Sequence, residues 1–244
     1  MSTIIALIPA RAGSERVKFK NIRELNGHPL IAYTIAIAKA SKLFDHIIVS
    51  TDSERIADVA LHYGAEVPFL RPKELADSQS LDISWLEFTL SKLNTVYSAF
   101  SILRPTSPFR TTAMIHKAWE LLNRVKGVDS IRAVQLCHEH PGKMWVTEKE
   151  LIKPYIPHDG SAIASHAKAY QALPNVYVQN SSLEMAWTRV VTETHSREGK
   201  IVAPLFTEDY EGFSIDYEID WLLAELLIKK KLVQLPVVEC SVYE

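Results

Sequence analysis

The sequence of 244 residues contains only two cysteines, Cys137 and Cys240, and no long apolar run. Two cysteines can form neither a disulfide framework nor a four-cysteine zinc site. A membrane-spanning helix needs about 18 to 20 consecutive apolar residues, and a secretory leader begins with a charged segment. The sequence has neither feature, so we expect a cytoplasmic protein that does not span a membrane.

The chain also lacks excess positive charge and the common glycine-rich phosphate motifs. Its formal net charge is −2, whereas nucleic-acid-binding domains are usually basic. The P-loop spacing G-x-x-x-x-G-K-[ST] and the dinucleotide fingerprint G-x-G-x-x-G are both absent. We therefore expect small-molecule partners and no nucleic acid.

Apolar, β-branched segments alternate with segments of helical periodicity over the first 135 residues. This pattern predicts strands at 3–9, 45–51, 65–70, 99–103 and 130–135. It predicts helices at 29–40, 54–63, 81–95 and 111–125, and a later strand and helix at 176–179 and 219–232. Strands separated by helices pair in parallel. The expected fold is therefore α/β, with a doubly wound, mostly parallel sheet.

This alternation stops after residue 136. Residues 138–172 are mixed in character and contain Pro154, Pro157 and Gly160, with a hairpin expected around 148–150. We interpret residues 138–172 as an inserted arm. Large apolar patches on a monomer usually mark an interface, so we expect this arm to contact a second subunit through Met144, Trp145, Ile152, Tyr155 and Ile156.

The most informative segment is the loop of residues 11–21, which follows the first strand. It carries four cations, Arg11, Arg16, Lys18 and Lys20. In α/β proteins, phosphate groups bind at the carboxyl end of such a strand. The cations can neutralise a triphosphate, and Gly13 lets backbone N–H groups approach it. The alternative is a solvated basic turn.

Two segments of this loop carry a family resemblance. Ala10-Arg11-Ala12-Gly13-Ser14 and Lys20-Asn21-Ile22 resemble the signature of the cytidylyltransferases that make CMP-activated acidic sugars, the CMP-acylneuraminate synthetases. Further segments agree in the same order, at 27–34, 48–52, 64–72 and 103–110. The resemblance implies a Rossmann-like nucleotidyltransferase fold over a single domain, 1–244, with CTP as donor, Mg²⁺ as cofactor and a homodimer as the assembly.

The resemblance also implies roles for individual residues of the nucleotide site. Arg11 and Lys20 are expected to bind the CTP phosphates and to neutralise the leaving pyrophosphate, as phosphoryl transfer requires. Asn21 and Arg71 are expected near the nucleotide, and Gly13 and Ser14 belong to the same loop. No histidine or acid can be assigned as the general base.

Residues 214–221 resemble the family's metal-binding stretch, in which two aspartates alternate with isoleucine. Ser214 takes the place of the first aspartate, and Asp216 matches the second. We therefore expect Asp216 to be a catalytic Mg²⁺ ligand and Asp220 to be a helix cap. The alternative is that these acids only stabilise a helix N-terminus.

The expected sugar site departs from the family pattern. Residues 173–180 resemble the segment that ends in Asn-Gly and lines this site, with Asn180 matching and Ser181 in place of glycine. The arginines expected for the sugar carboxylate correspond to Tyr170 and Val178. We expect sugar binding by Asn180, Arg104 and Lys143, with Lys168 and Arg189 as further sources of positive charge.

Two other motifs can be explained without a functional role. Arg104 replaces the usual glutamine before Pro105-Thr106-Ser107-Pro108, a segment that otherwise reads as a structural turn with Arg110 in solvent. His138-x-His140 has no visible third ligand, so we do not expect a zinc site.

These observations predict transfer of CMP from CTP to a hydroxyl of a sialic acid-like keto sugar, with release of pyrophosphate. Two alternatives remain open. One is a nucleotidyltransferase of the same fold with a different acceptor or donor, indicated by Arg104, Tyr170 and Val178. The other is a nucleotide-binding relative with weak catalysis, indicated by Ser214.

Overall fold

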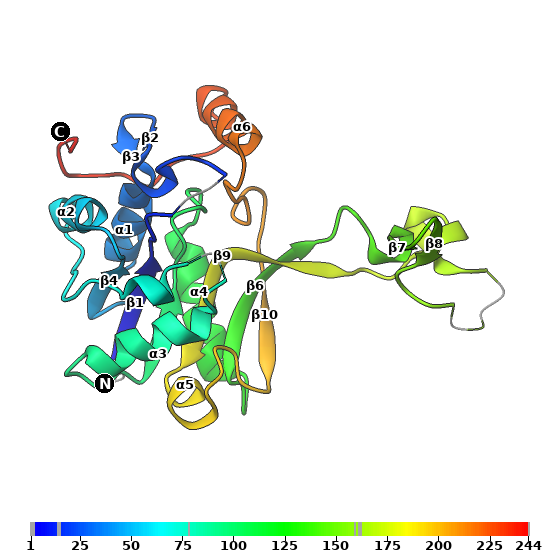
Figure 1. The fold of residues 1–244 in the computed structure, drawn as a ribbon, viewed down its shortest axis with the longest axis horizontal. Helices are drawn as coiled ribbons and strands as arrows, with labels where there is room; N and C mark the ends of the chain where they lie inside the picture. Colours follow the sequence, from blue (N-terminus) through cyan, green and yellow to red (C-terminus); the bar gives the residue numbers. More distant parts are fainter. Residues whose placement is uncertain (1–2, 14–15, 78, 159, 161–162, 244) are drawn as a thin grey trace. The chain divides into compact units, whose positions relative to one another are not determined.

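The computed structural model describes residues 3–13, 16–77, 79–158, 160 and 163–243. Its main feature is a six-stranded sheet in the order β10-β6-β9-β5-β1-β4 (Figure 1). β1 (Ile4–Pro9) pairs in parallel with β4 (His46–Ser50) and with β5 (Ala99–Ile102). β9 (Tyr177–Trp187) runs antiparallel to β5. The sheet is therefore mixed, and β1, β4 and β5 form a parallel part of it.

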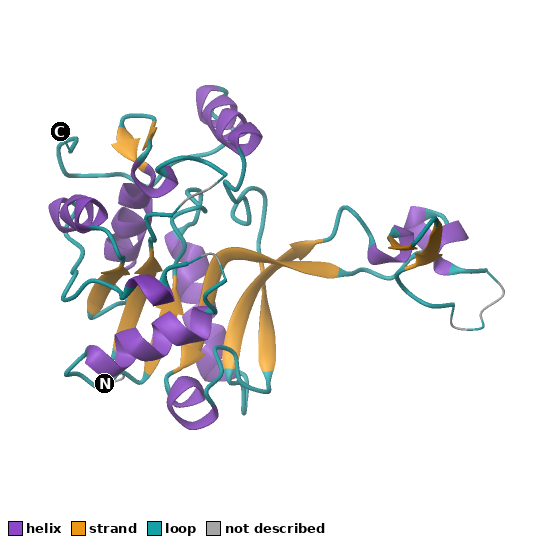
Figure 2. Ribbon diagram, in the orientation of Figure 1, coloured by secondary structure: helices purple, strands orange, loops and turns teal. Residues whose placement is uncertain are grey.

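Helices cover both faces of this sheet (Figure 2). On one face lie α1 (Leu30–Ser41), α2 (Glu54–His62) and α4 (Thr112–Arg124), and on the other lie α3 (Asp82–Lys92) and α5 (Arg189–Thr194). The last helix, α6 (Glu218–Lys229), packs in a third cluster with residues of α1 and of the loops beyond the sheet. Four further strands are β2 (Glu24–Leu25), β3 (His28–Pro29), β6 (Ser130–Leu136) and β10 (Val202–Phe206). The starts of α2 and α4 are stabilised by side-chain caps, because Ser53 and Thr111 accept hydrogen bonds from backbone N–H groups there.

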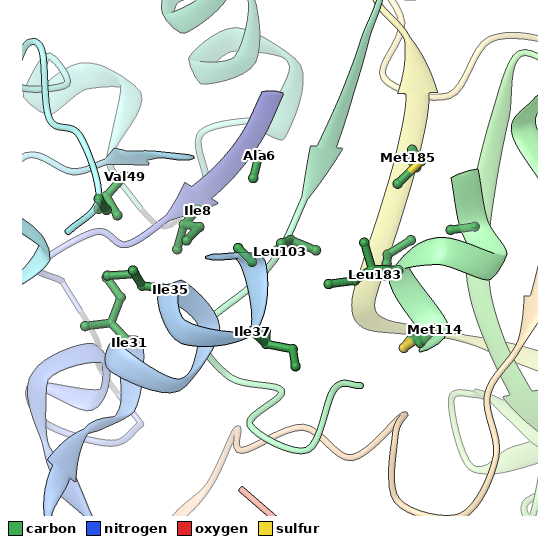
Figure 3. Packing of buried hydrophobic residues seen from close by; sticks show 14 of the residues in the cluster. Ala6, Ile8, Ile31, Ile35, Ile37, Val49, Leu103, Met114, Leu183 and Met185 are labelled. Atoms are coloured by element: carbon green, nitrogen blue, oxygen red, sulfur yellow. The ribbon is translucent and has the colours of Figure 1, made fainter. Parts of the chain in front are cut away.

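Successive residues of β1 contribute to different hydrophobic clusters. Ala6 and Ile8 pack with Ile31 and Ile35 of α1, whereas Leu7 packs in a separate cluster with residues of α3 and α5. Figure 3 shows Ile8 beside the side chains of α1. Side chains alternate between the two faces of a strand, so an apolar strand of this kind must be covered on both sides.

The predicted strand at 65–70 is wrong. Only an isolated bridge between Ile48 and Glu66 forms there. Pro68 follows two residues later and has no N–H group for a further ladder bond. The predicted strand at 176–179 is too short, since β9 continues to Trp187. Neither α5 nor β10 was predicted from the sequence.

Residues 134–179 form a second compact unit, separate from the unit that contains the residues up to 133 and from 180 onward. The unit boundaries fall within β6 and β9, and the second unit includes the whole range interpreted as an arm. The predicted hairpin is confirmed by the antiparallel pair β7 (Trp145–Glu148) and β8 (Leu151–Pro154).

His140 is a structural residue of this second unit. Its Nδ1 accepts a bond of 2.9 Å from the Gly142 amide, and its Nε2 lies 2.9 Å from the Pro174 carbonyl oxygen. The Tyr170 hydroxyl accepts a bond from the His140 amide at 2.6 Å. Both ring nitrogens of His140 are thus engaged inside the unit. In the parts of the chain that the structure describes, no helix has the length and apolar character needed to cross a membrane.

Candidate functional site

The carboxyl ends of β1, β4 and β5 meet at one edge of the sheet. Beyond the end of β1, the Ala10 amide donates to the Ser50 carbonyl at 3.0 Å, and the Leu103 amide donates to the Leu7 carbonyl at 3.0 Å. The loops that follow these three strands therefore begin side by side. This edge is where open α/β sheets bind their ligands.

The basic loop is attached to its neighbours through its backbone. The Ala12 amide donates to the Asp52 carboxylate at 2.8 Å, and the buried Asn21 side chain donates to the Arg11 carbonyl at 3.1 Å. Asn21 thus shapes the loop from within. A Cβ added at Gly13 would meet no atom of the described residues within 4 Å, so these residues leave room for a side chain there. Ser14 lies outside the described residues.

The Arg11 guanidinium group bonds to backbone carbonyls of a neighbouring loop. It donates to the Ala76 carbonyl at 3.5 Å and also to the Asp77 carbonyl. These hydrogen-bond partners are neutral, although the Arg11 charge also acts on the exposed carboxylate of Asp77. Among the described residues no carboxylate bonds to Arg11 directly, so its charge can also act on an anion at the edge of the sheet.

Lys20 and Asp216 are brought together at this edge. The Lys20 ammonium donates to the Ile215 carbonyl at 2.8 Å and lies 3.4 Å from the Asp216 carboxylate. Burial lowers the pKa of Lys20, and the Asp216 charge opposes that shift. The Ser214 hydroxyl donates to Asp216 at 2.9 Å. The basic loop and the predicted metal stretch are therefore parts of one site.

The predicted capping role of Asp220 is confirmed. Its carboxylate accepts bonds from the amides of Asp216 and Tyr217 at 2.9 and 2.8 Å, at the start of α6. This arrangement satisfies N–H groups that the helix leaves unpaired. The bond from the Asp216 amide also fixes the backbone of Asp216 and therefore helps to position its carboxylate.

Arg71 lies beneath the same edge and is buried. Its guanidinium group donates to the Ser50 carbonyl at 2.8 Å and to the Ser50 hydroxyl at 3.1 Å, and it lies 4.9 Å from the Trp85 ring centroid. Burial lowers the pKa of Arg71 to about 10, against the opposing charges of Asp52 and Asp82. Arg71 therefore adds a fixed positive charge close to Arg11 of the basic loop.

Arg104 takes part in a network of charged side chains that the sequence analysis missed. Its guanidinium group lies 2.5 Å from Asp82 and 3.4 Å from Glu184. Arg197 also contacts Asp82 and Glu184, and Arg132 contacts Glu184 and Glu198 at 3.3 and 2.6 Å. We call these six residues the Arg104 network: Asp82, Arg104, Arg132, Glu184, Arg197 and Glu198.

Arg110 is fully buried, so the alternative that it is solvated is wrong. It donates to the carbonyls of Ser182 and Arg104 at 2.5 and 3.0 Å and to the Thr34 hydroxyl at 3.4 Å. Burial lowers the pKa of Arg110 to about 9. Its bonds connect the turn after β5 with α1 and β9, which makes Arg110 a structural residue of the site.

The predicted sugar residues fall into different parts of the molecule. Asn180 donates to the Thr207 hydroxyl at 3.1 Å in the first unit. Lys143 belongs to the second unit, where its ammonium donates to the His166 and Lys168 carbonyls at 2.9 and 2.5 Å. Tyr170 and Val178 are exposed.

The prediction that Arg189 supplies positive charge to this site is wrong. It pairs with Asp129 at 2.7 Å. The Asp129 carbonyl accepts the Trp187 amide, and Trp187 pairs with Ala99 at the amino end of β5. Arg189 therefore lies at the opposite edge of the sheet.

Comparisons with known proteins agree on one family. Residues 5–192 match the family model described as cytidylyltransferase. The chain is 36% identical over 234 residues to CMP-N,N'-diacetyllegionaminic acid synthase of Legionella pneumophila, covering 93% of this chain and 96% of that protein. It is 40% identical over 131 residues to N-acylneuraminate cytidylyltransferase of Escherichia coli, covering 54% of this chain and 31% of that protein.

A solved structure has the same fold. CMP:2-keto-3-deoxy-manno-octonic acid synthetase complexed with CTP superposes with a TM-score of 0.70 at 12% identity, covering 94% of this chain and 100% of that one. The α/β fold predicted from the alternating pattern, and the Rossmann-like architecture that the family resemblance implies, are thereby confirmed.

Proposed function

Because this chain belongs to the cytidylyltransferase family, we propose that it transfers CMP from CTP to a hydroxyl group of a sialic acid-like acidic keto sugar and releases pyrophosphate. The observation that carries the proposal is the meeting of the basic loop with Asp216 at the carboxyl edge of the sheet. The near full-length similarity to a CMP-N,N'-diacetyllegionaminic acid synthase supports the same donor and acceptor classes.

The reaction joins the acceptor oxygen to the α-phosphorus of CTP and breaks the bond from that phosphorus to the bridging oxygen. Pyrophosphate leaves with the bonding electrons, so negative charge grows on its oxygens. In such transfers the protein mainly positions the reactants and neutralises this charge. Arg11 and Lys20 are suited to the leaving pyrophosphate, and Arg71 contributes a buried positive charge nearby.

We propose Asp216 as the protein ligand of Mg²⁺. Its side chain is 47% exposed, and the hydroxyl of Ser214 is the adjacent oxygen donor. The structure's described residues include no cluster of three or more acidic, histidine or cysteine ligands. Mg²⁺ suits such a site, because it commonly uses one or two carboxylates together with substrate phosphates and water. When bound, the metal would supply further neutralisation of phosphate charge.

We also propose that the second unit mediates homodimer formation. Its hairpin exposes Trp145, Leu151 and Ile152, and Tyr155 follows with 59% of its surface exposed. Burial of such a patch against an identical patch would remove it from water. The homodimer stays a proposal that rests on this surface.

Pyrophosphate release tests the proposed function. The purified chain would be incubated with Mg²⁺, one nucleoside triphosphate, and one acceptor chosen from N,N'-diacetyllegionaminic acid, N-acetylneuraminic acid and 2-keto-3-deoxy-manno-octonic acid. Turnover with CTP and one of the first two acceptors is expected. A second candidate is a nucleotidyltransferase of the same fold with a different donor or acceptor, which Arg104 in place of glutamine favours. Turnover only with another nucleoside triphosphate, or only with 2-keto-3-deoxy-manno-octonic acid or an added sugar phosphate, would support it. CTP binding without turnover on any acceptor would overturn the proposal.

A further inference from the structure

The Arg104 network lies at the edge of the sheet used by the nucleotide site. Asp82 is the first residue of α3, and Arg104 follows the end of β5. The charges of Asp82 and Arg104 both act on Arg71, and so does the charge of Arg11. The network is therefore adjacent to the basic loop and lies within the first unit.

Fold stability is a weak reason for such a network. Moving charges out of water costs free energy that their mutual attraction repays only with good geometry, and an apolar replacement is often as stable. The side chains of Arg132 and Glu184 are only 10% and 8% exposed. A network of three arginines and three carboxylates at this position therefore suggests a role in fixing one of its members.

Arg104 and Arg197 are both held by carboxylates and partly exposed, at 23% and 22%. Arg197 pairs through all three of its nitrogens, whereas Arg104 keeps N–H groups for a ligand. Asp82 accepts from both terminal nitrogens of Arg104, at 2.5 and 3.5 Å, and Glu184 accepts from one of them at 3.4 Å. Within the described part of the chain, the Nε–H and one terminal N–H of Arg104 donate to no other group.

The carboxylates, by contrast, are used inside the network. Asp82 also accepts from the Trp85 ring nitrogen at 2.9 Å and from Arg197. The formal charges of the six residues sum to zero. The nearby positive charge of Arg71 is opposed by the carboxylate of Asp52. What remains for a ligand is a pair of N–H donors with little net positive charge around them, which suits a neutral oxygen better than a carboxylate.

We propose that Asp82 and Glu184 are positioning residues that orient Arg104 to donate to a neutral oxygen of the acceptor sugar, a hydroxyl or an acylamino carbonyl. This proposal rests on the proposed function, because it concerns the acceptor side of the same site. Arg104 then determines acceptor specificity without contributing to CTP binding. Orientation by two carboxylates reduces the side-chain freedom lost when the sugar binds.

Binding measurements can separate this role from catalysis. Affinities for CMP and for CMP-N,N'-diacetyllegionaminic acid would be measured by calorimetry for the wild type, Asp82→Asn, Arg104→Gln and the double variant. We expect each single variant to weaken binding of the CMP-sugar about tenfold, the order of one lost hydrogen bond to a charged group, and to leave CMP within about twofold. The double variant should equal Arg104→Gln, because the two residues act as a unit.

The carboxylate methyl ester of the same CMP-sugar tests the chemistry of the contact. The penalty of Arg104→Gln should be equal for acid and ester if the partner oxygen is neutral. A penalty seen with the acid alone would show that Arg104 binds the sugar carboxylate and would overturn the assignment. Arg104→Lys should not restore affinity, because a lysine cannot reproduce the fork that Asp82 holds.

Asp129→Asn is the matched control. It breaks the Arg189–Asp129 pair of 2.7 Å at the opposite edge of the sheet, and it should leave the ratio of the two affinities unchanged. If Asp82→Asn weakens CMP and the CMP-sugar equally, or if it changes only the melting temperature, the positioning role is wrong. Failure of the proposed function would instead appear as a wild-type chain that releases no pyrophosphate with CTP and any acceptor.

Discussion

The ammonium nitrogen of Lys20 lies 3.4 Å from the carboxylate of Asp216, although the two residues are 196 positions apart. The Lys20 side chain is 15% exposed, and burial lowers its pKa. A neighbouring anion opposes such a shift, because it favours the charged form of the lysine. Asp216 is that anion here, and the phosphates of CTP would provide more negative charge.

Removal of the Lys20 charge should therefore slow the chemical step. In Lys20→Met we expect kcat with CTP to fall about 100-fold or more, the size of effect seen when one group that stabilises developing charge is removed. Steady-state pyrophosphate release measures this. Lys117→Met, which removes a half-exposed lysine on α4 paired with Glu208 at 3.5 Å, should change kcat by less than about twofold. Equal losses in both variants would contradict the role of Lys20.

Arg11 should be required for use of CTP. Its guanidinium group bonds only to neutral carbonyls among the residues that the structure describes, so its charge is free to meet the phosphates. Arg11→Ala should lower kcat/KM for CTP by about 100-fold or more. The same assay on Arg124→Ala, which removes an exposed arginine of α4, provides the comparison. Turnover of Arg11→Ala within a few-fold of wild type would remove Arg11 from the phosphate site.

The Mg²⁺ dependence should follow the number of carboxylates beside Lys20. Asp216→Asn should raise the Mg²⁺ concentration needed for half-maximal rate at least tenfold, because it removes the charged ligand. Ser214→Asp should lower that concentration, because it adds a second carboxylate next to the first. Glu218→Gln breaks only an exposed pair with Arg23 at 2.7 Å and should have no effect. An unchanged requirement in Asp216→Asn would exclude Asp216 as the ligand.

The sequence predicted the nucleotide half of this site because its parts follow strand ends. The loop after β1, Arg71 and Asp216 were each singled out by local pattern or family resemblance, and the fold brings Lys20 and Asp216 into contact. The Arg104 network could not be predicted in this way. Asp82, Glu184 and Arg197 are far apart in the chain and lie in segments without a motif. Arg104 in place of glutamine was the only local signal.

The fold was predicted best where helices and strands alternate with clear caps. The prediction was poor after residue 180, because β9 is long and runs antiparallel to β5. It therefore does not follow the alternation of strand and helix on which the prediction was based. The strand at 65–70 failed because Pro68 prevents ladder bonding. The first error came from long-range pairing, which local propensity does not determine. The second came from a local proline that the apolar pattern outweighed in the prediction.

The exposed hairpin of the second unit should control association. Leu151 and Ile152 are 74% and 61% exposed, so Leu151→Glu/Ile152→Glu should not disturb the unit itself but should place charges in the proposed interface. Sedimentation velocity should show a dimer for wild type and a monomer for the double variant. Val96→Glu, at a residue that is 90% exposed in the first unit, should remain dimeric. A wild-type monomer at micromolar concentration would contradict the proposed homodimer.

Acidification should weaken the fold through Asp82 in a defined range of pH. Burial raises the pKa of this carboxyl, but the charges and bonds of Arg104, Trp85 and Arg197 outweigh burial and lower it from 3.8 to about 2. A depressed pKa contributes stability that is complete above the unfolded value and is lost as the pH falls through the folded value. The full contribution is about 2 kcal/mol, at 1.36 kcal/mol per pKa unit.

Asp82→Asn isolates this contribution because it removes only one titrating group. Its free energy of unfolding in urea should be lower than that of wild type at pH 5, and the difference should shrink by about 1 kcal/mol by pH 3. Asp129→Asn, which breaks the ion pair of Asp129 with Arg189, is the comparison variant, and its free energy of unfolding would be measured over the same range of pH. A difference between wild type and Asp82→Asn that stays constant from pH 5 to pH 3 would mean that Arg104 and Arg197 do not hold Asp82 ionised in the folded state.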